Sequence, residues 1–432
     1  MKQPLFCLLI VIGVAGGCRE KPAFAPDTID AIARDYVLLS LTIGEKEEGY
    51  VDSYYGPPNL QAKAVADAPR ETLDTLAKRT SALSKRVDNL SRQLTGMEGR
   101  RAKFLSAQLT AAATRLRMMR GEKLSFADEA QGLFGLRPNL KPLESYQPIL
   151  HQIDAMVPGA GPLDERVQAF QSKFIIPSEK QKPVFEAAIA ECRARTAQHI
   201  ALPKGENFQL GFVRGKSWSA YNYYKGHYRS LIDINTDLPI PISRAVEFGC
   251  HEGYPGHHVW NTLLEERLTN GRKWIEFSVF PLFSPQAFIA EGSAEYGINL
   301  AFPGTERLKY EVTKLYPLAG IPTLDAERYS DLQEAMSKLQ GARLTIAQEL
   351  LDGNITEADA VRLTQHYLLV SPGMARRLTA MAREMRTYII NEGLGAEMVR
   401  EDVEGTGPSP AERWRRMEQL ISEPTLARDL GS

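Results

Sequence analysis

The chain has 432 residues, of which 43% are hydrophobic and 24% are charged, and its formal net charge is −1. This composition is typical of a folded protein with one large domain or two medium ones, and it excludes a largely disordered chain. The balanced charge and the lack of long basic runs argue against nucleic acid as a partner.

The first 27 residues predict an exported protein with a lipid anchor. Lys2 precedes an apolar run over residues 5–14, which is shorter than the roughly 20 residues needed to span a bilayer and indicates a signal peptide. Small residues lead into Cys18 and resemble a bacterial lipobox, although Ala15 stands where that pattern usually has Leu. We therefore expect a signal peptide over 1–17, lipid on Cys18 and a tether over 18–27. A plain secretory signal is the alternative.

This anchor would place the protein in the cell envelope, attached to a membrane through Cys18. Arg19, rather than Asp, follows the cysteine. In a Gram-negative host this resembles the signal for an outer-membrane location facing the periplasm.

Helical spacing of apolar residues begins after the tether, with Ile29, Ile32 and Tyr36 on one face. Residues 44–58 interrupt the pattern with glycines, prolines and several tyrosines. Residues 71–121 predict two long amphipathic helices with a break near 96–99, and residues 164–174 and 178–200 predict further helices. Residues 201–241 predict strands, because glycines alternate with aromatics and residues 231–236 alternate apolar with polar. Helical patterns then continue to about residue 428. The expected fold class is mainly α with one small β element.

The strongest chemical signal is a cluster of histidines at positions 251–258, H-E-G-Y-P-G-H-H, in a chain with only seven histidines. Histidine nitrogens bind zinc, and a neighbouring glutamate, here Glu252, can accept a proton from the reacting water. Proline at 255 replaces the second histidine of the HExxH motif. On a regular helix His257 would point about 240° around from His251. The Pro–Gly pair at 255–256 supplies a break that can bring His257 to the second ligand position.

A third ligand is expected on a second helix. Glu291 and Glu295 lie four residues apart on one face of the helix predicted over 288–296, among small residues that indicate close packing. In zinc peptidases of the gluzincin type, a glutamate on a downstream helix is the third ligand, and a carboxylate four residues later holds a ligating histidine in place. We expect Glu291 in the first role and Glu295 in the second, with His258 as the alternative to His257.

The motif at 251–258, with E-G-S-A at 291–294, resembles the hallmark of the DUF885 family, bacterial proteins in the gluzincin-like metallopeptidase group. Residues 50–58 and 215–221 are similar to elements of a lipoprotein-like branch, and residues 342–344 and 372–374 to further family elements, although Met374 replaces a glutamine. The resemblance implies a helical, two-lobed fold with a central cleft, a zinc ion and peptidase activity. We place an N-terminal helical lobe over 28–240 and a metal-site lobe over 241–432.

The expected function is zinc-dependent hydrolysis of a peptide bond. His251, His257 and Glu291 would hold the zinc ion, and Glu252 would activate the water. The alternatives are a non-catalytic binding lipoprotein on the same fold and a zinc amidase that acts on a non-peptide amide, such as one of the cell wall.

Several other side chains have open assignments. Candidates for stabilising the oxyanion are His366, Tyr367 and Arg343, with His227, Tyr228 and Tyr254 in a wider pool. Tyr221 and Tyr223 fit either a substrate groove or an aromatic core. For Cys192 and Cys250, two buried free thiols are favoured over a disulfide.

Overall fold

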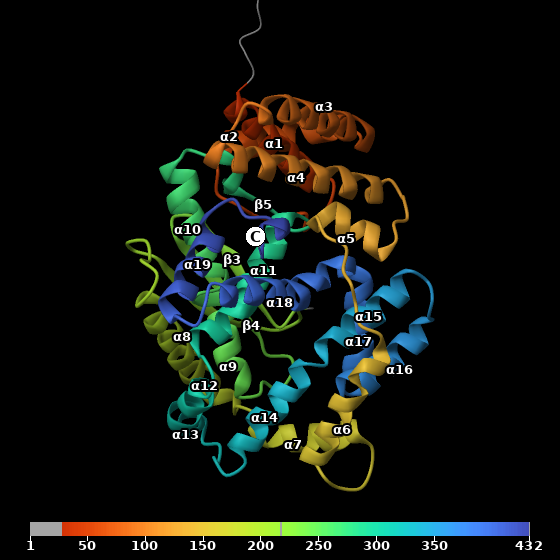
Figure 1. Ribbon diagram of the computed structural model, residues 1–432, viewed down its shortest axis with the longest axis vertical. Coiled ribbons are helices and arrows are strands. Elements are labelled where there is room, and N and C mark those ends of the chain that lie inside the picture. Colours follow the sequence, from red (N-terminus) through yellow and green to blue (C-terminus); the bar gives the residue numbers. More distant parts are fainter. Residues whose placement is uncertain (1–27, 217, 432) are drawn as a thin grey trace, which may run out of the picture.

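The computed structural model describes residues 28–216 and 218–431, so the expectations for the signal peptide, the tether and Cys18 lie outside the described residues. The described chain is mainly α-helical with a small β element (Figure 1). The fold class expected from the sequence is therefore confirmed. The division into lobes at residue 240 stays a prediction.

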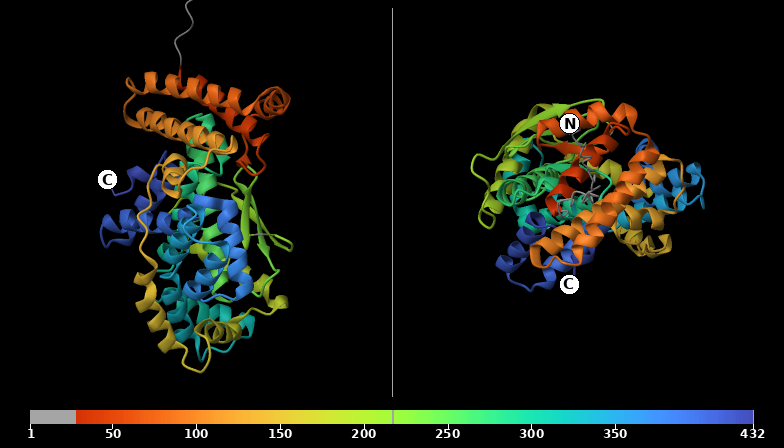
Figure 2. Two further views of the ribbon diagram at one scale, coloured as in Figure 1. Left: turned by 90° about the vertical axis from the view of Figure 1, so that its right-hand side faces the viewer. Right: turned by 90° about the horizontal axis from the view of Figure 1, so that it is seen from above.

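Four helices form a layer at the N-terminal end of the molecule, across the top of Figure 1 and of the left view in Figure 2. They are α1 (Ile29–Gly44), α2 (Pro58–Asp67), α3 (Leu73–Ser91) and α4 (Gly96–Met119). Thr72 starts α3 with a capping box, because its hydroxyl accepts from the Thr75 N–H and the Thr75 hydroxyl accepts from the Thr72 N–H. A break separates α3 from α4 at residues 92–95, just before residues 96–99, near which it was expected and which form the first turn of α4. Apolar residues at helical spacing, such as Tyr36, Leu76 and Leu105, are buried between these helices.

A buried ion pair ties this layer to the rest of the molecule. The Arg101 side chain on α4 donates from Nε and Nη2 to the two carboxylate oxygens of Glu276, at 2.6 and 3.0 Å. Glu276 lies just before β5 (Val279–Pro281), which pairs antiparallel with β1 (Val51–Tyr54). β1 was not expected as a strand, because its pairing partner lies far along the chain and local pattern cannot reveal it. The pairing brings residues 50–55 beside the core.

The second sheet has three strands and stands beside the histidine motif. β2 (Asn207–Val213) runs parallel to β4 (Arg229–Asn235), and β3 (Ala220–Tyr224) runs antiparallel to the other side of β4. The strands expected within residues 201–241 are therefore confirmed. β3 is an edge strand whose side chains alternate, with Tyr221 and Tyr223 half-buried on one face and Asn222 and Tyr224 buried on the other.

Two helices, α11 (Pro285–Ala301) and α18 (Ile390–Gly405), pack closely at the centre. Their backbones approach at Gly292 and Gly395, where a Cβ on Gly292 would lie 2.6 Å from the carbonyl carbon of Gly395. The other helices lie beside this pair or toward the lower end of the molecule in Figure 1: α5 (Phe126–Phe134), α6 (Gln147–Met156), α7 (Leu163–Gln171), α8 (Gln181–Ala197), α9 (Ser243–Phe248), α10 (His257–Leu264), α12 (Glu306–Tyr310), α13 (Tyr316–Ala319), α14 (Ala326–Ser337), α15 (Gln340–Leu351), α16 (Glu357–Leu368), α17 (Pro372–Met385) and α19 (Pro410–Ser422).

Cys192 on α8 and Cys250 form a disulfide, whereas the sequence favoured two free thiols. Their Cα atoms lie 5.5 Å apart and both side chains are fully buried. The expectation was wrong because it rested on how seldom one pair forms a bridge in a large domain, and the packing of α8 against residues 249–253 leaves no trace in local sequence. The disulfide ties this segment, and therefore His251, to α8.

Candidate metal centre

The site begins with a break in the helix that carries the histidines. α9 runs into a π-helical turn, Gly249–Gly253, and a new helix, α10, starts at His257. The peptide bond before Pro255 is cis. A Cβ on Gly256 would lie 1.8 Å from the carbonyl oxygen of His251, so only glycine fits there. The break expected at the Pro–Gly pair is present, and it brings the ring centroids of His251 and His257 to 4.7 Å.

His251, His257 and Glu291 converge on one point, with all three ligand atoms within 4.8 Å of one another. Glu291 Oε2 lies 3.3 Å from His251 Nε2 and 3.4 Å from His257 Nε2. A tetrahedral zinc ion with ligands roughly 2.0–2.1 Å away has its ligand atoms about 3.3 Å apart. The two measured separations match this spacing, so the donor set and its geometry fit a zinc ion.

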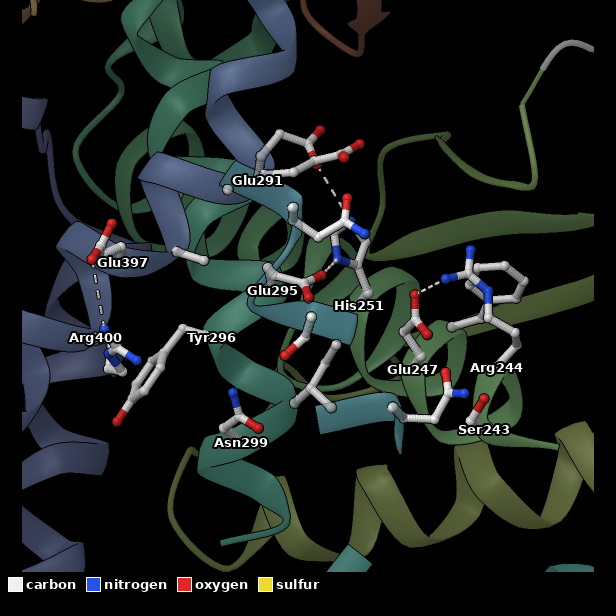
Figure 3. A pocket seen from close by; sticks show the side chains of 18 of the residues that line it. Ser243, Arg244, Glu247, His251, Glu291, Glu295, Tyr296, Asn299, Glu397 and Arg400 are labelled. Carbon is white, nitrogen blue, oxygen red and sulfur yellow. Dashed lines mark hydrogen bonds and ion pairs between the residues drawn. The ribbon is translucent and has the colours of Figure 1, made fainter. Parts of the chain in front are cut away.

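Glu295 lies one turn further along α11, on the far side of His251. Its Oε2 is 3.3 Å from His251 Nδ1, so it can fix the ring while Nε2 faces Glu291 (Figure 3). Burial would raise the pKa of Glu295, but His251 and then the positive charges of Arg244 and Arg307 outweigh it and lower the pKa. Glu295 therefore stays ionised. The four-residue spacing thus places Glu295 beside His251 as expected, and its role in orienting the ring stays a prediction.

Tyr388 holds the carboxylate of Glu291, the third expected ligand, and was not predicted from the sequence. Its hydroxyl donates to Glu291 Oε1 at 2.6 Å, which leaves Glu291 Oε2 directed at the two histidines. Burial, and then the negative charge of Glu291, raise the pKa of Tyr388 well above its ordinary value, so the hydroxyl keeps its proton. Tyr388 lies in an ordinary helical pattern far from the motif, and no local feature marks it.

The turn before Tyr388 contains a residue with a strained backbone, Arg386. Arg386 has φ 51° and ψ −128°, a conformation that costs a non-glycine residue on the order of 1–3 kcal/mol. The buried carboxylate of Glu129 on α5 accepts hydrogen bonds from Arg386 Nε at 2.7 Å and from the Thr387 hydroxyl at 2.9 Å. These charge-assisted bonds offset the strain. The turn is therefore held in the conformation that places Tyr388 against Glu291.

Glu252 lies beside the three converging side chains but outside their group. It is 7% exposed and lines the cleft. Burial raises its pKa, while the neighbouring His251 and His257 act in the opposite direction. A raised carboxyl pKa suits a group that must both accept and return a proton near neutral pH. Its backbone carbonyl accepts a hydrogen bond from Asn222 Nδ2 at 2.7 Å, which connects the turn to β3.

His258, the expected alternative ligand, points away from this group. Its Nδ1 lies 2.9 Å from the Ser230 hydroxyl and its Nε2 lies 3.0 Å from Glu206 Oε2. Tyr254 also donates to Glu206 Oε2, at 2.5 Å. The side chain of His258 is fully buried and both its ring nitrogens have partners, so it supports the turn and does not join the cluster.

Of the expected oxyanion candidates, Arg343 lines the cleft and pairs with Glu392 at 3.2 Å. His366 and Tyr367 lie outside the cleft lining that the described residues form. Tyr367 instead accepts a hydrogen bond from Gln147 Nε2 at 3.3 Å, and the His366 ring packs edge-on against it. They were selected by residue type alone, and the direction in which α16 presents them could not be predicted.

A cleft of about 2750 Å³ opens beside the cluster, and Figure 3 shows part of its wall. Asp52, just after the start of β1, lines it and accepts a hydrogen bond from the Tyr221 hydroxyl on β3. Burial raises the pKa of Asp52 to about 6, against the effect of the Tyr221 hydrogen bond. The stretches 50–58 and 215–221, which resembled elements of one family branch, therefore meet at this site.

No family model matches the chain, and no curated protein matches it significantly. Among solved structures, a candidate lipoprotein of Colwellia psychrerythraea has a TM-score of 0.50 at 14% identity, over 83% of this chain and 71% of its own. That likeness shows the fold. The expected membership of the DUF885 family stays a prediction.

Two further structures are less similar. A candidate lipoprotein of unknown function from Shewanella oneidensis has a TM-score of 0.41 at 12% identity, over 92% of this chain and 74% of its own. An M32 carboxypeptidase of Deinococcus radiodurans R1 has a TM-score of 0.38 at 13% identity, over 90% and 88%. Neither likeness is strong enough to carry an argument.

Within residues 28–216 and 218–431, no helix is both long and apolar enough to cross a membrane.

Proposed function

We propose that the protein is a zinc-dependent hydrolase that cleaves peptide bonds. The observation that carries this proposal is the convergence of His251 Nε2, His257 Nε2 and Glu291 Oε2, with separations of 3.3 and 3.4 Å to the carboxylate oxygen. Zinc held there would act as a Lewis acid that activates water and polarises the substrate carbonyl.

The neighbouring residues would transfer the proton and orient the ligands. Glu252 accepts a proton from the attacking water and passes it to the leaving amine, since it is buried beside the cluster with a raised pKa. Glu295 orients His251, and Tyr388 orients Glu291. The cleft of about 2750 Å³ is larger than the roughly 300–1,000 Å³ of small-molecule pockets, which favours a chain-like substrate such as a peptide.

A binding lipoprotein and an amidase for non-peptide amides are the competing proposals. A binding protein that used the metal alone would need no buried carboxylate next to it, and Glu252 occupies that place. An amidase would use the same residues, so only the substrate separates it from a peptidase.

We further propose that the protein is lipid-anchored through Cys18 in the cell envelope, on the outer membrane in a Gram-negative host. Two observations support export. The sequence before Cys18 resembles a lipobox, and a buried disulfide joins Cys192 and Cys250, as is usual in oxidising compartments. The solved structure with a TM-score of 0.50 is also described as a candidate lipoprotein.

Glu252→Gln separates an enzyme from a binder. The change keeps the size of the side chain but removes the proton acceptor, and loss of a general base typically lowers the rate about 10²–10⁴-fold. We expect the variant to be folded, to hold about one zinc and to be nearly inactive on a peptide library. Metal content is measured by elemental analysis of protein purified without chelators.

Glu334→Gln is the matched control, because Glu334 also lines the cleft but pairs with the exposed Lys338. It should retain wild-type zinc and activity. Full activity of Glu252→Gln on a confirmed substrate would remove Glu252 from the mechanism, and loss of its zinc would make it a ligand. Wild-type protein that binds zinc and peptides but hydrolyses none would favour the binding protein.

A further inference from the structure

Three aromatic side chains form one wall of the cleft. Trp218, Tyr221 and Tyr223 are each half-buried and line it. The ring centroids of Trp218 and Tyr221 lie 5.5 Å apart and those of Tyr221 and Tyr223 lie 4.7 Å apart. The sequence left open whether the tyrosines belong to a core or to a groove, and their position in the cleft decides for the groove. We call these three residues the aromatic wall.

The wall lies next to the reacting groups because β3 runs beside the turn that carries Glu252 and beside the start of α10. Asn222, between the two tyrosines, points to the other face and donates to the backbone carbonyl of Glu252 at 2.7 Å. Tyr221 and Tyr223 therefore lie on either side of Asn222, the residue that binds the turn carrying Glu252, and each is about 3.3 Å from Asn222 along the strand. The Tyr221 hydroxyl donates to Asp52, and both residues line the cleft.

The shape and charge of the wall select among possible ligands. The Trp218 and Tyr221 rings are inclined at 38° and the Tyr221 and Tyr223 rings at 41°, so together they offer faces and edges around a volume and not one flat platform. The ammonium of Lys225 lies 4.9 Å from the Tyr223 centroid, and that of Lys216 lies 6.0 Å from the Trp218 centroid. These two ammonium groups are balanced by the carboxylates of Asp52 and Asp233, which act on Tyr221 and Tyr223, so the wall carries no excess charge and favours an uncharged side chain.

From these contacts we propose that the aromatic wall is a specificity subsite that binds a large apolar or aromatic side chain of the substrate, next to the bond that is cleaved. The proposal rests on the proposed peptidase function and adds its substrate class. Burial of an apolar side chain against the rings supplies the binding energy, since each apolar group removed from water contributes roughly in proportion to its area. A peptide with alanine at that position would leave the volume unfilled.

The test compares two peptides that differ only in having Phe or Ala beside the scissile bond. Wild-type protein should cleave the Phe peptide with a kcat/KM at least about 10-fold higher, because even one methylene in a pocket changes it roughly 10–200-fold. Trp218→Ala and Tyr223→Ala should each reduce this preference several-fold, because kcat/KM should fall more for the Phe peptide than for the Ala peptide, with the zinc content nearly unchanged. Phe212→Ala is the matched control, because Phe212 is an exposed aromatic on β2 outside the cleft lining of the described residues.

Binding to metal-loaded Glu252→Gln protein, measured by calorimetry with the same two peptides, separates the subsite from the catalytic proposal. Tighter binding of the Phe peptide, lost in the Trp218→Ala/Glu252→Gln double variant, supports the subsite even if no hydrolysis is found. Hydrolysis without a Phe preference overturns the subsite and leaves the peptidase function standing. Equal losses for both peptides in Trp218→Ala, or binding of N-acetylglucosamine oligomers in place of the Phe peptide, also overturn it.

Discussion

Tyr388→Phe should weaken zinc binding while leaving the fold intact. The substitution removes one oxygen atom, and the ring keeps its neighbours Phe134 and Phe283, whose centroids lie 6.4 and 6.1 Å away. What is lost is the 2.6 Å hydrogen bond to Glu291 Oε1. Without it the Glu291 carboxylate can rotate, and Oε2 is no longer held toward the two histidines.

The size of the effect follows from the charge on the acceptor. A hydrogen bond to a charged group contributes about 1.5–3 kcal/mol. Since about 1.4 kcal/mol corresponds to a factor of ten, the zinc dissociation constant should rise about 10- to 150-fold. The usual loss when a group supporting a metal ligand is removed, about 10- to 100-fold, covers nearly the same range.

The assay is a competition titration of metal-free protein with zinc and a chromophoric chelator, with thermal unfolding as the check on folding. Tyr296→Phe is the matched control, because Tyr296 lies on the same helix as Glu291 and its hydroxyl contacts Glu404 at 3.4 Å, away from the cluster. Equal zinc affinity for Tyr388→Phe and wild type would refute the orienting role. An equal loss in Tyr296→Phe would show that the effect is not specific to Glu291.

Two further predictions concern stability. The Cys192→Ala/Cys250→Ala double variant should lose up to about 4 kcal/mol in free energy of unfolding, because the bridge closes a loop with a separation of 58 residues; urea unfolding that shows no loss would contradict this. For Glu206, burial would raise the pKa, but hydrogen bonds from His258, Tyr254 and Arg193 outweigh it and lower the pKa to about 2. Between about pH 4.5 and pH 2 the unfolded chain therefore binds a proton that the folded protein does not, and the free energy of unfolding falls as the pH falls. In chelator-treated Glu206→Gln, measured by urea unfolding, the free energy of unfolding should fall less steeply with falling pH than in wild type. The difference in slope should correspond to up to about one bound proton, and an unchanged slope would contradict the low pKa of Glu206.

The parts of the site that were predicted from the sequence have signals within a few residues. The proline–glycine break shows at positions 255–256, and its effect on His257 follows from helix geometry. The four-residue spacing of Glu291 and Glu295 likewise places both on one face of α11, where one meets each side of His251. Most helices and the strands near residues 207–235 were also predictable, because hydrophobic periodicity records burial directly, whereas α2, α5 and α6 were not among the expected helices.

The parts that were missed depend on contacts between distant segments. Asp52, Tyr388 and Glu129 reach the site only because β1 pairs with β5, because α18 packs on α11, and because α5 meets the turn before α18. Tyr388 and Glu129 sit in unremarkable local sequences, and the stretch around Asp52 was marked only by its similarity to a family element. A single chain offers residue types but not the directions in which helices present them, which is why His366 was selected and Tyr388 was not.

Some residues of the histidine motif face the metal centre and others support the broken helix, and this difference has a physical reason. A helix broken by proline and glycine gives up backbone hydrogen bonds, so other groups must hold the broken segment in place. The disulfide at Cys250 holds the start of this segment, and Asn222 donates to the carbonyl of Glu252. At the end of the segment, Tyr254 and His258 are hydrogen-bonded to the carboxylate of Glu206. His258 is therefore needed to fix the position from which its neighbour His257 faces Glu291. Replacing His258 should consequently disturb zinc binding indirectly, so loss of zinc in such a variant would not by itself identify a ligand.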